Sequence, residues 1–182
     1  MDGPDVTGHH RKTLNMTTRA KRTASTAPEI RTVLAALAAT PKQIARLARG
    51  HSPRQLHRKP AADAWSAQEI VAHLRACAEV WGGSIDRMLG EDHPTIRYVS
   101  PRGWIRKTDY LEQSFDDSLR AFSDRRATLL KTLKGLDAIG WSRRATFTAT
   151  TLGRDATVLS YATRIADHEV RHLGQLERTI KT

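Results

Sequence analysis

Hydrophobic positions recur with a helical period along four long segments of the chain. They are spaced three or four residues apart, which places them on one face of an α-helix and leaves the other face polar. This pattern predicts helices over residues 28–50, 66–90, 108–134 and 155–180. Pro41 falls inside the first of these helices, and we expect it to kink or break that helix because proline lacks the amide hydrogen that a helix interior uses.

Capping residues and irregular stretches predict where these helices begin and how they are joined. Ser66 with Glu69 three residues on forms a capping box directly before an apolar run, which is typical of a helix start. Ser52 followed by Pro53 predicts one short helical turn. Residues 91–107 and 135–155 have no sustained period, so we expect long connections there, with a short strand or turn near residues 145–151.

Four long helices separated by one short and two long connections predict an all-α fold, a four-helix bundle over residues 28–182. A chain of 182 residues is long enough for one domain with a sizeable core. Residues 1–27 are polar and basic and have no hydrophobic period. We therefore expect a disordered basic tail ahead of the bundle.

Composition narrows the classes of function. The formal net charge is +11, but the basic residues of the helices alternate with acidic ones, which favours a solvated basic surface over a specific nucleic-acid site. A lone cysteine, Cys77, excludes an internal disulfide framework. The chain has no apolar run of the ~18 residues that a membrane span requires, and its start lacks a secretory signal. We expect a cytoplasmic protein that does not contact membranes.

Three histidines on two predicted helices are the main candidates for chemistry. His168 and His172 are four residues apart, so their rings project from one helix face. His73 lies on the apolar stripe of another helix and can supply a third ligand. Three imidazoles with one position left open are typical of a catalytic zinc-type site. The sequence thus predicts a divalent-metal site, and imidazole suits zinc and nickel alike.

Two carboxylates lie close to these histidines in the sequence. The string from His168 to His172 fits the pattern HExxH, in which the glutamate, here Glu169, activates a metal-bound water. Only ten residues follow His172, which leaves no room for the downstream third ligand of that class. Glu169 also lies about 100° around the helix from His168, and the sequence does not fix which way it points. Glu69 either orients a metal ligand or only caps its helix.

Two further side chains have open roles at this stage. Cys77 shares a helix face with His73 and is either a fourth ligand, a thiol acceptor or a small core residue. Gln175 lies one turn beyond His172 and either bonds to the site or points outward.

Several strings resemble the DinB-like superfamily, in particular its small stand-alone members, over residues 28–181. They are WSAQEIVAHL, GEDHPT and ADHEVRHLGQLERTI, with a histidine eight residues after Trp65 and a closing His-x-x-x-His-x-x-Gln. The resemblance implies an up-down-down-up bundle, often a homodimer, in which three histidines hold zinc or nickel at one end. It also implies enzymes that use a low-molecular-weight thiol such as bacillithiol or mycothiol, or hydrolases.

Three hypotheses follow for the function. In the first, the metal lowers the pKa of a cofactor thiol, which then attacks an electrophilic small-molecule substrate. In the second, the same metal activates water for hydrolysis, with Glu169 or Glu69 as the catalytic base. In the third, the chain is a basic binding protein without enzymatic activity, and the histidines serve the structure.

Overall fold

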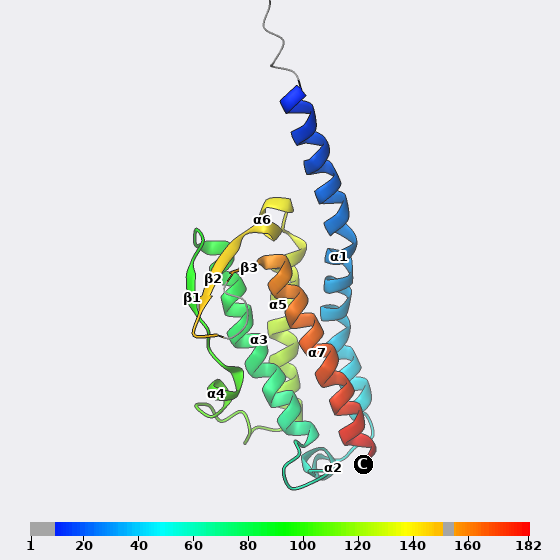
Figure 1. Ribbon diagram of the computed structural model, residues 1–182. Helices are drawn as coiled ribbons and strands as arrows, with labels where there is room; N and C mark the ends of the chain where they lie inside the picture. The colour runs from blue at the N-terminus through cyan, green and yellow to red at the C-terminus, as the bar shows by residue number, and fades with distance from the viewer. Residues whose placement is uncertain (1–9, 151–154) are drawn as a thin grey trace, which may run out of the picture. The chain divides into compact units, whose positions relative to one another are not determined.

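The computed structural model describes the backbone of residues 10–150 and 155–182, with side chains from residue 27 onward. In this part of the chain, four long helices are joined by three short ones (Figure 1). The long helices are α1 (His10–Ala48), α3 (Ala67–Gly90), α5 (Phe115–Lys134) and α7 (Val158–Lys181), and the short ones are α2 (Pro53–His57), α4 (Pro101–Ile105) and α6 (Ala138–Ser142). The predicted four-helix bundle is confirmed, and it lies in a compact unit that spans Val33–Thr182.

Helix α1 differs from its prediction at two places. It begins at His10 rather than near residue 28, within the segment 1–27 that we predicted as a tail, and residues 1–9 of that segment lie outside the described residues. Residues 10–27 contain neither proline nor glycine, and extending an existing helix requires no new nucleus. The helix also continues through Pro41 without a break, because Leu37 and Ile44 are fully buried on either side and their burial offsets one lost hydrogen bond.

Polar caps fix the starts of the other long helices. The Ser66 hydroxyl accepts from the Glu69 amide at 3.2 Å, and the Glu69 carboxylate accepts from the Ser66 amide at 2.8 Å, which confirms the capping box. Helix α5 begins at Phe115 rather than near residue 108, because Ser114 caps it by accepting from the amide of Asp117. Helix α7 begins at Val158, three residues later than expected, after the cap residue Thr157.

The directions in which the four long helices run determine how they are connected. Helices α3 and α5 run in one direction, and α7 and the part of α1 within the bundle run in the other (Figure 1). This is the expected up-down-down-up arrangement. Because α3 and α5 are parallel, residues 91–114 must return along the bundle before α5 can begin. This return connection contains α4.

A small sheet joins the two long connections. Its strands are β1 (Thr95–Arg97), β2 (Arg144–Thr148) and β3 (Asp155–Thr157), in the order β1-β2-β3. Strand β1 pairs with β2 in parallel, and β2 pairs with β3 antiparallel. Strand β2 lies where we expected a short strand or turn. We did not expect β1 and β3, because three residues are too few to show the alternation that predicts a strand.

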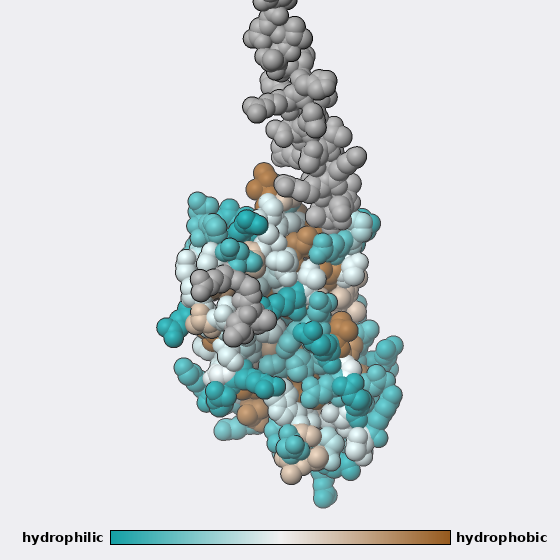
Figure 2. Space-filling model, viewed as in Figure 1, coloured by the Kyte–Doolittle hydropathy of each residue, from teal (hydrophilic) through white to brown (hydrophobic). Residues whose placement is uncertain are grey.

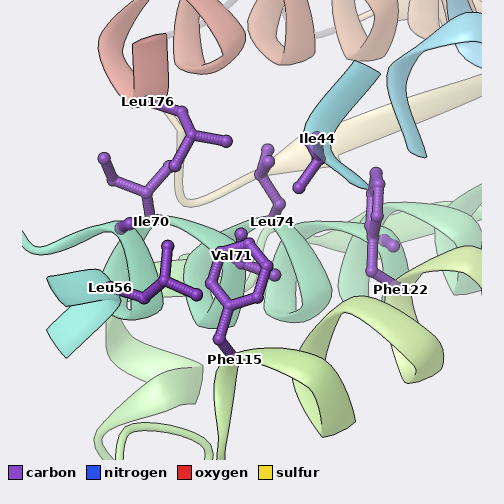
Figure 3. Close-up of a cluster of buried hydrophobic side chains, with 10 residues drawn as sticks. Ile44, Leu56, Ile70, Val71, Leu74, Phe115, Phe122 and Leu176 are labelled. Atoms are coloured by element: carbon purple, nitrogen blue, oxygen red, sulfur yellow. The ribbon is translucent and has the colours of Figure 1, made fainter. Parts of the chain in front are cut away.

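The hydrophobic core lies where the helices meet, and Figure 3 shows one of its clusters. Side chains from five helices contribute: Ile44, Leu56, Ile70, Val71, Leu74, Phe115, Phe122 and Leu176. Full burial of such a side chain contributes about 1.5–3 kcal/mol. Ile70 and Leu74 flank His73 on α3, and Leu176 lies one turn beyond His172 on α7. The core therefore fixes the rotation of both helices that carry the histidines.

The surface is mainly hydrophilic on the face that Figure 2 shows, and hydrophobic residues are scattered among the hydrophilic ones. None of the described helices has an apolar stretch long enough to cross a membrane.

Candidate metal centre

The three predicted histidines converge between α3 and α7. The Nε2 atom of His168 lies 3.4 Å from Nε2 of His73 and 3.1 Å from Nε2 of His172. The ring centroids of His73 and His172 are 4.8 Å apart. His73 is buried at 5% exposure, whereas His168 and His172 are half-buried. Three ring nitrogens from two helices thus face a common point.

This spacing fits a metal ion. Two imidazole nitrogens bound to one tetrahedral zinc at 2.0–2.1 Å lie about 3.3 Å apart. The two Nε2 distances measured here, 3.4 and 3.1 Å, bracket that value. In the absence of an ion, facing nitrogens of this kind can share at most one hydrogen bond per pair. The cluster can therefore hold a divalent metal.

Neighbouring side chains orient the rings. Gln175 Oε1 lies 2.8 Å from Nδ1 of His172 and accepts a hydrogen bond from the Nδ1–H group, which leaves the Nε2 lone pair directed toward the cluster. The indole of Trp65 is stacked on His172, with an interplanar angle of 7° and a centroid distance of 6.2 Å. Trp81 packs edge-on against His168, with centroids 4.7 Å apart. The role of Gln175, which the sequence left open, is thus to bond to a histidine of the site.

The electrostatics of the cluster favour neutral rings. Burial, together with the charges of His172 and Arg102, lowers the pKa of His73 from 6.5 to about 3. Burial and the two neighbouring histidines likewise lower the pKa of His168 to about 3. The pKa of His172 is also lowered by burial, against the opposing effect of its hydrogen bond to Gln175. Neutral imidazole is the form that binds metal.

Cys77 lies on the inner side of the cluster. Its sulfur is 3.4 Å from Nε2 of His73, so His73, Cys77 and His168 form a second possible donor set. Burial and the Glu169 carboxylate raise the pKa of the Cys77 thiol well above its ordinary value. A metal in this set would have to displace that proton, whereas a neutral imidazole binds a metal through a lone pair without losing a proton. The chemistry of the donors favours the three histidines.

Glu169 points away from the ring nitrogens. Its carboxylate accepts a hydrogen bond from Nη2 of Arg126 on α5, and both side chains are 1% exposed. Burial raises the pKa of this carboxyl, and the Arg126 guanidinium opposes the shift. The rotation of about 100° per residue along α7 sends Glu169 into the core next to His168. This geometry favours a structural role for Glu169 over that of a catalytic base.

Glu69 is engaged at the start of α3. Besides its capping bond to Ser66, its carboxylate forms an ion pair with Lys59 at 2.8 Å. The hydrogen bonds and charge of Lys59 and Ser66 lower its pKa, against the effect of burial. The described contacts of Glu69 therefore account for it as the capping residue of α3, and its role in catalysis stays a prediction.

A cavity of about 410 Å³ opens beside His172. Its wall includes Trp65 from the segment before α3, Arg102 from α4, and Gln175 and Arg178 from α7. The indole of Trp65 also contacts His73, with ring centroids 5.0 Å apart. The half-buried side of the cluster therefore faces a space that a small molecule can enter.

Comparison with known proteins identifies the family. Residues 36–176 match the DinB superfamily. The chain belongs to the DinB superfamily. This membership covers both helices that carry the histidines, and it confirms the family expected from the sequence motifs.

Two solved DinB-like structures share the fold of this DinB-superfamily chain. YfiT from Bacillus subtilis, described as a probable metal-dependent hydrolase with an unusual four-helix bundle topology, superposes with a TM-score of 0.68 and 17% identity over 84% of this chain and 87% of its own. The DinB-like protein YjoA from Bacillus subtilis has a TM-score of 0.57 and 16% identity over 82% of this chain and 90% of its own. At these identities the likeness shows the fold alone. Among curated proteins, no sequence matches this chain.

Sequence reasoning missed three residues around this DinB-superfamily site. Arg102 and Arg178 line the cavity, and Trp65 both packs against the core and stacks on His172. Arg102 lies in a connection without a hydrophobic period, so its sequence context carried no signal. Arg178 lies on the same helix as His172 and Gln175, and its helical spacing from them was the one available clue.

Proposed function

We propose that this protein is a divalent-metal-dependent transferase that couples a low-molecular-weight thiol to an electrophilic small molecule. The observation that carries the proposal is the convergence of the ring nitrogens of His73, His168 and His172 beside an accessible cavity. These three residues would hold zinc or nickel. A bound ion of this kind supplies Lewis acidity, which lowers the pKa of a ligand at its open position.

The chain's own residues support a thiol that comes from outside. Cys77 is buried and its thiol pKa is raised, so it stays protonated and is a poor nucleophile. Glu169 and Glu69, the carboxylates expected to activate a water, are engaged by Arg126 and by Ser66 and Lys59. Gln175 holds His172 in the ligating tautomer, and Trp65 shields the rings from water on one side.

A second candidate function is metal-dependent hydrolysis. The likeness to YfiT, which is described as a probable metal-dependent hydrolase, favours it. Asp63 lines the cavity and is a carboxylate that could accept a proton from water there. The two candidates share the metal site and differ in whether a thiol is required.

Metal content is the first test. After reconstitution with zinc or with nickel and removal of free ions, elemental analysis should find about one ion per wild-type chain, the single-ion case for three convergent imidazoles. The His168→Ala variant should lose the ion, and His93→Ala, which alters an exposed histidine of the return connection, should keep it. A metal-free wild type, or a fully loaded His168→Ala variant, would overturn the proposal.

Thiol dependence is the second test. The loaded protein should accelerate loss of an activated aryl halide only when bacillithiol or mycothiol is present, and His172→Ala should abolish this acceleration. Thiol-independent cleavage of an activated ester, lost in Asp63→Asn, would instead assign the chain as a hydrolase. These assays separate the two candidates because one needs a second substrate and the other needs water alone.

A further inference from the structure

We propose that the cavity beside His172 binds the carboxylate group of a small-molecule substrate, with Arg102 and Arg178 as its anion-binding residues. That the carboxylate belongs to a substrate rests on the proposed function. That the cavity binds a carboxylate rests on the cavity's own lining, and a separate experiment can test it.

The cavity has the size and position of a substrate site. Its volume of about 410 Å³ falls within the range of about 300–1,000 Å³ that is typical of small-molecule sites. His172, Gln175 and the stacked indole of Trp65 all line it. A molecule bound there would contact the aromatic wall and reach the histidine cluster.

Two guanidinium groups give the cavity its charge. Arg102 comes from α4 and Arg178 from the last turns of α7, whereas Asp63 is the one acidic side chain in the lining. Neither arginine forms an ion pair among the described residues, although six other pairs are present there. A planar guanidinium can bind both oxygens of a carboxylate at once, which makes unpaired arginines in a cavity suited to that group.

Both guanidiniums are placed toward the site. Arg102 lies 5.1 Å above the Trp65 ring, the same ring that stacks on His172. Arg178 folds back along α7, so that its Nη1 atom lies 3.5 Å from where a Cβ on Gly174 would be. Both arginines are exposed to solvent, and an anion held by them would sit at the mouth of the cavity that His172 lines.

The shape of the site favours a small acid over a larger anionic partner. A nucleic acid or an acidic protein would need an extended basic surface. Here the two arginines line one cavity with an indole in its wall. Along the helices, basic residues alternate with acidic ones. The substrate class that this lining fits is a carboxylate-bearing small molecule whose electrophilic centre extends toward His172.

Succinate is a suitable probe, and the indole resonance of Trp65 in a heteronuclear NMR titration reports its binding. Zinc-loaded wild type should bind succinate, and Arg102→Gln and Arg178→Gln should each raise the Kd at least about tenfold, as expected for loss of a charge-assisted contact. Two controls remove a positive charge without altering the lining. Arg106→Gln lies one turn beyond Arg102, and Arg171→Gln lies on α7 near the histidines. Both controls should bind succinate as wild type does.

Three results would overturn the inference. The first is equal weakening in Arg106→Gln and Arg171→Gln, which would show that general charge is responsible. The second is binding of neutral succinamide as tight as that of succinate. The third is tighter binding of inorganic phosphate than of succinate, which would assign the cavity to a different anion.

The zinc content of every sample separates this inference from the proposed function. A wild type that binds no zinc but still binds succinate through both arginines would overturn the proposed function and leave the anion site standing. A zinc-loaded wild type that does not bind succinate would overturn the anion site and leave the proposed function standing.

Discussion

Two adjacent residues of α7, His168 and Glu169, belong to two buried polar regions that differ in how they avoid an uncompensated charge. His168 faces a cluster of rings whose pKa values are lowered, so the cluster avoids buried charge by staying neutral. Glu169 enters the core as part of an ion pair with Arg126, so that region keeps charge and compensates it internally. The first arrangement leaves ring nitrogens for a ligand, and the second commits a carboxylate oxygen to the Arg126 guanidinium. The difference shows that one helix can separate a reactive region from a structural one by the rotation of a single residue.

The largest expected effect comes from breaking the buried pair. Arg126→Met should leave the Glu169 carboxylate uncompensated and lower the free energy of unfolding by about 3–5 kcal/mol. Urea denaturation followed by circular dichroism measures this. The double variant Arg126→Met with Glu169→Leu should recover most of the loss, because it replaces both charges by apolar groups. A loss well below 1 kcal/mol in the single variant would contradict a tightly compensated pair.

The neutral histidine cluster predicts that the stability of the metal-free protein depends on pH. In the folded protein the pKa of His73 and of His168 is about 3, against 6.5 for an ordinary histidine, so the unfolded chain takes up more protons between these values. Stability of the metal-free protein should therefore be full above pH 6.5 and decline as the pH falls toward 3. Urea unfolding across this window measures the slope. His73→Gln with His168→Gln should flatten it, and an unchanged slope would assign the loss to other groups.

A smaller effect is expected from the residue that orients His172. Gln175→Leu removes the acceptor for the Nδ1 proton and should weaken zinc binding by about 10–100-fold, as is usual for partners of metal-bound histidines. Competition with a chromogenic chelator measures the affinity. Gln175→Glu keeps an acceptor at this position and should retain most of it. If Leu and Glu behaved alike, the hydrogen bond would have no part in binding the metal.

The smallest effect is expected at Cys77, and it decides between the two donor sets. If zinc is held by His73, His168 and His172, Cys77→Ala should leave the zinc affinity unchanged. The same chelator competition serves as the measurement. A fall of more than about 100-fold would mean that the thiolate is a ligand and that the site is the set His73, Cys77 and His168.

Local features of the sequence predicted much of this fold and part of its site. The spacing of His168 and His172 and the capping box at Ser66 depend on a few neighbouring residues, so the sequence alone revealed them. The approach of His73 to the other two rings depends on how α3 packs against α7. This approach is a matter of tertiary structure, which the helical spacing of the sequence does not determine.

Other features depend wholly on packing. The pattern HExxH suggested an active role for Glu169, but which face of α7 is buried decides where that carboxylate goes. Arg102 approaches Trp65 only because the return connection places α4 there, and nothing within five residues of Arg102 indicates this. Strands β1 and β3 are defined by their partner β2 rather than by their own three residues.

The parallel course of α3 and α5 has a consequence for engineering. It obliges residues 91–114 to travel back past the histidines, and this detour delivers Arg102 to the rim of the cavity while the ligands themselves stay on α3 and α7. One part of the cavity wall thus comes from a stretch of chain that carries none of the three histidines, while Arg178 and Gln175 come from α7 itself. The wall of the cavity can therefore be varied by exchanging residues 91–114 alone, with the two histidine-bearing helices left intact.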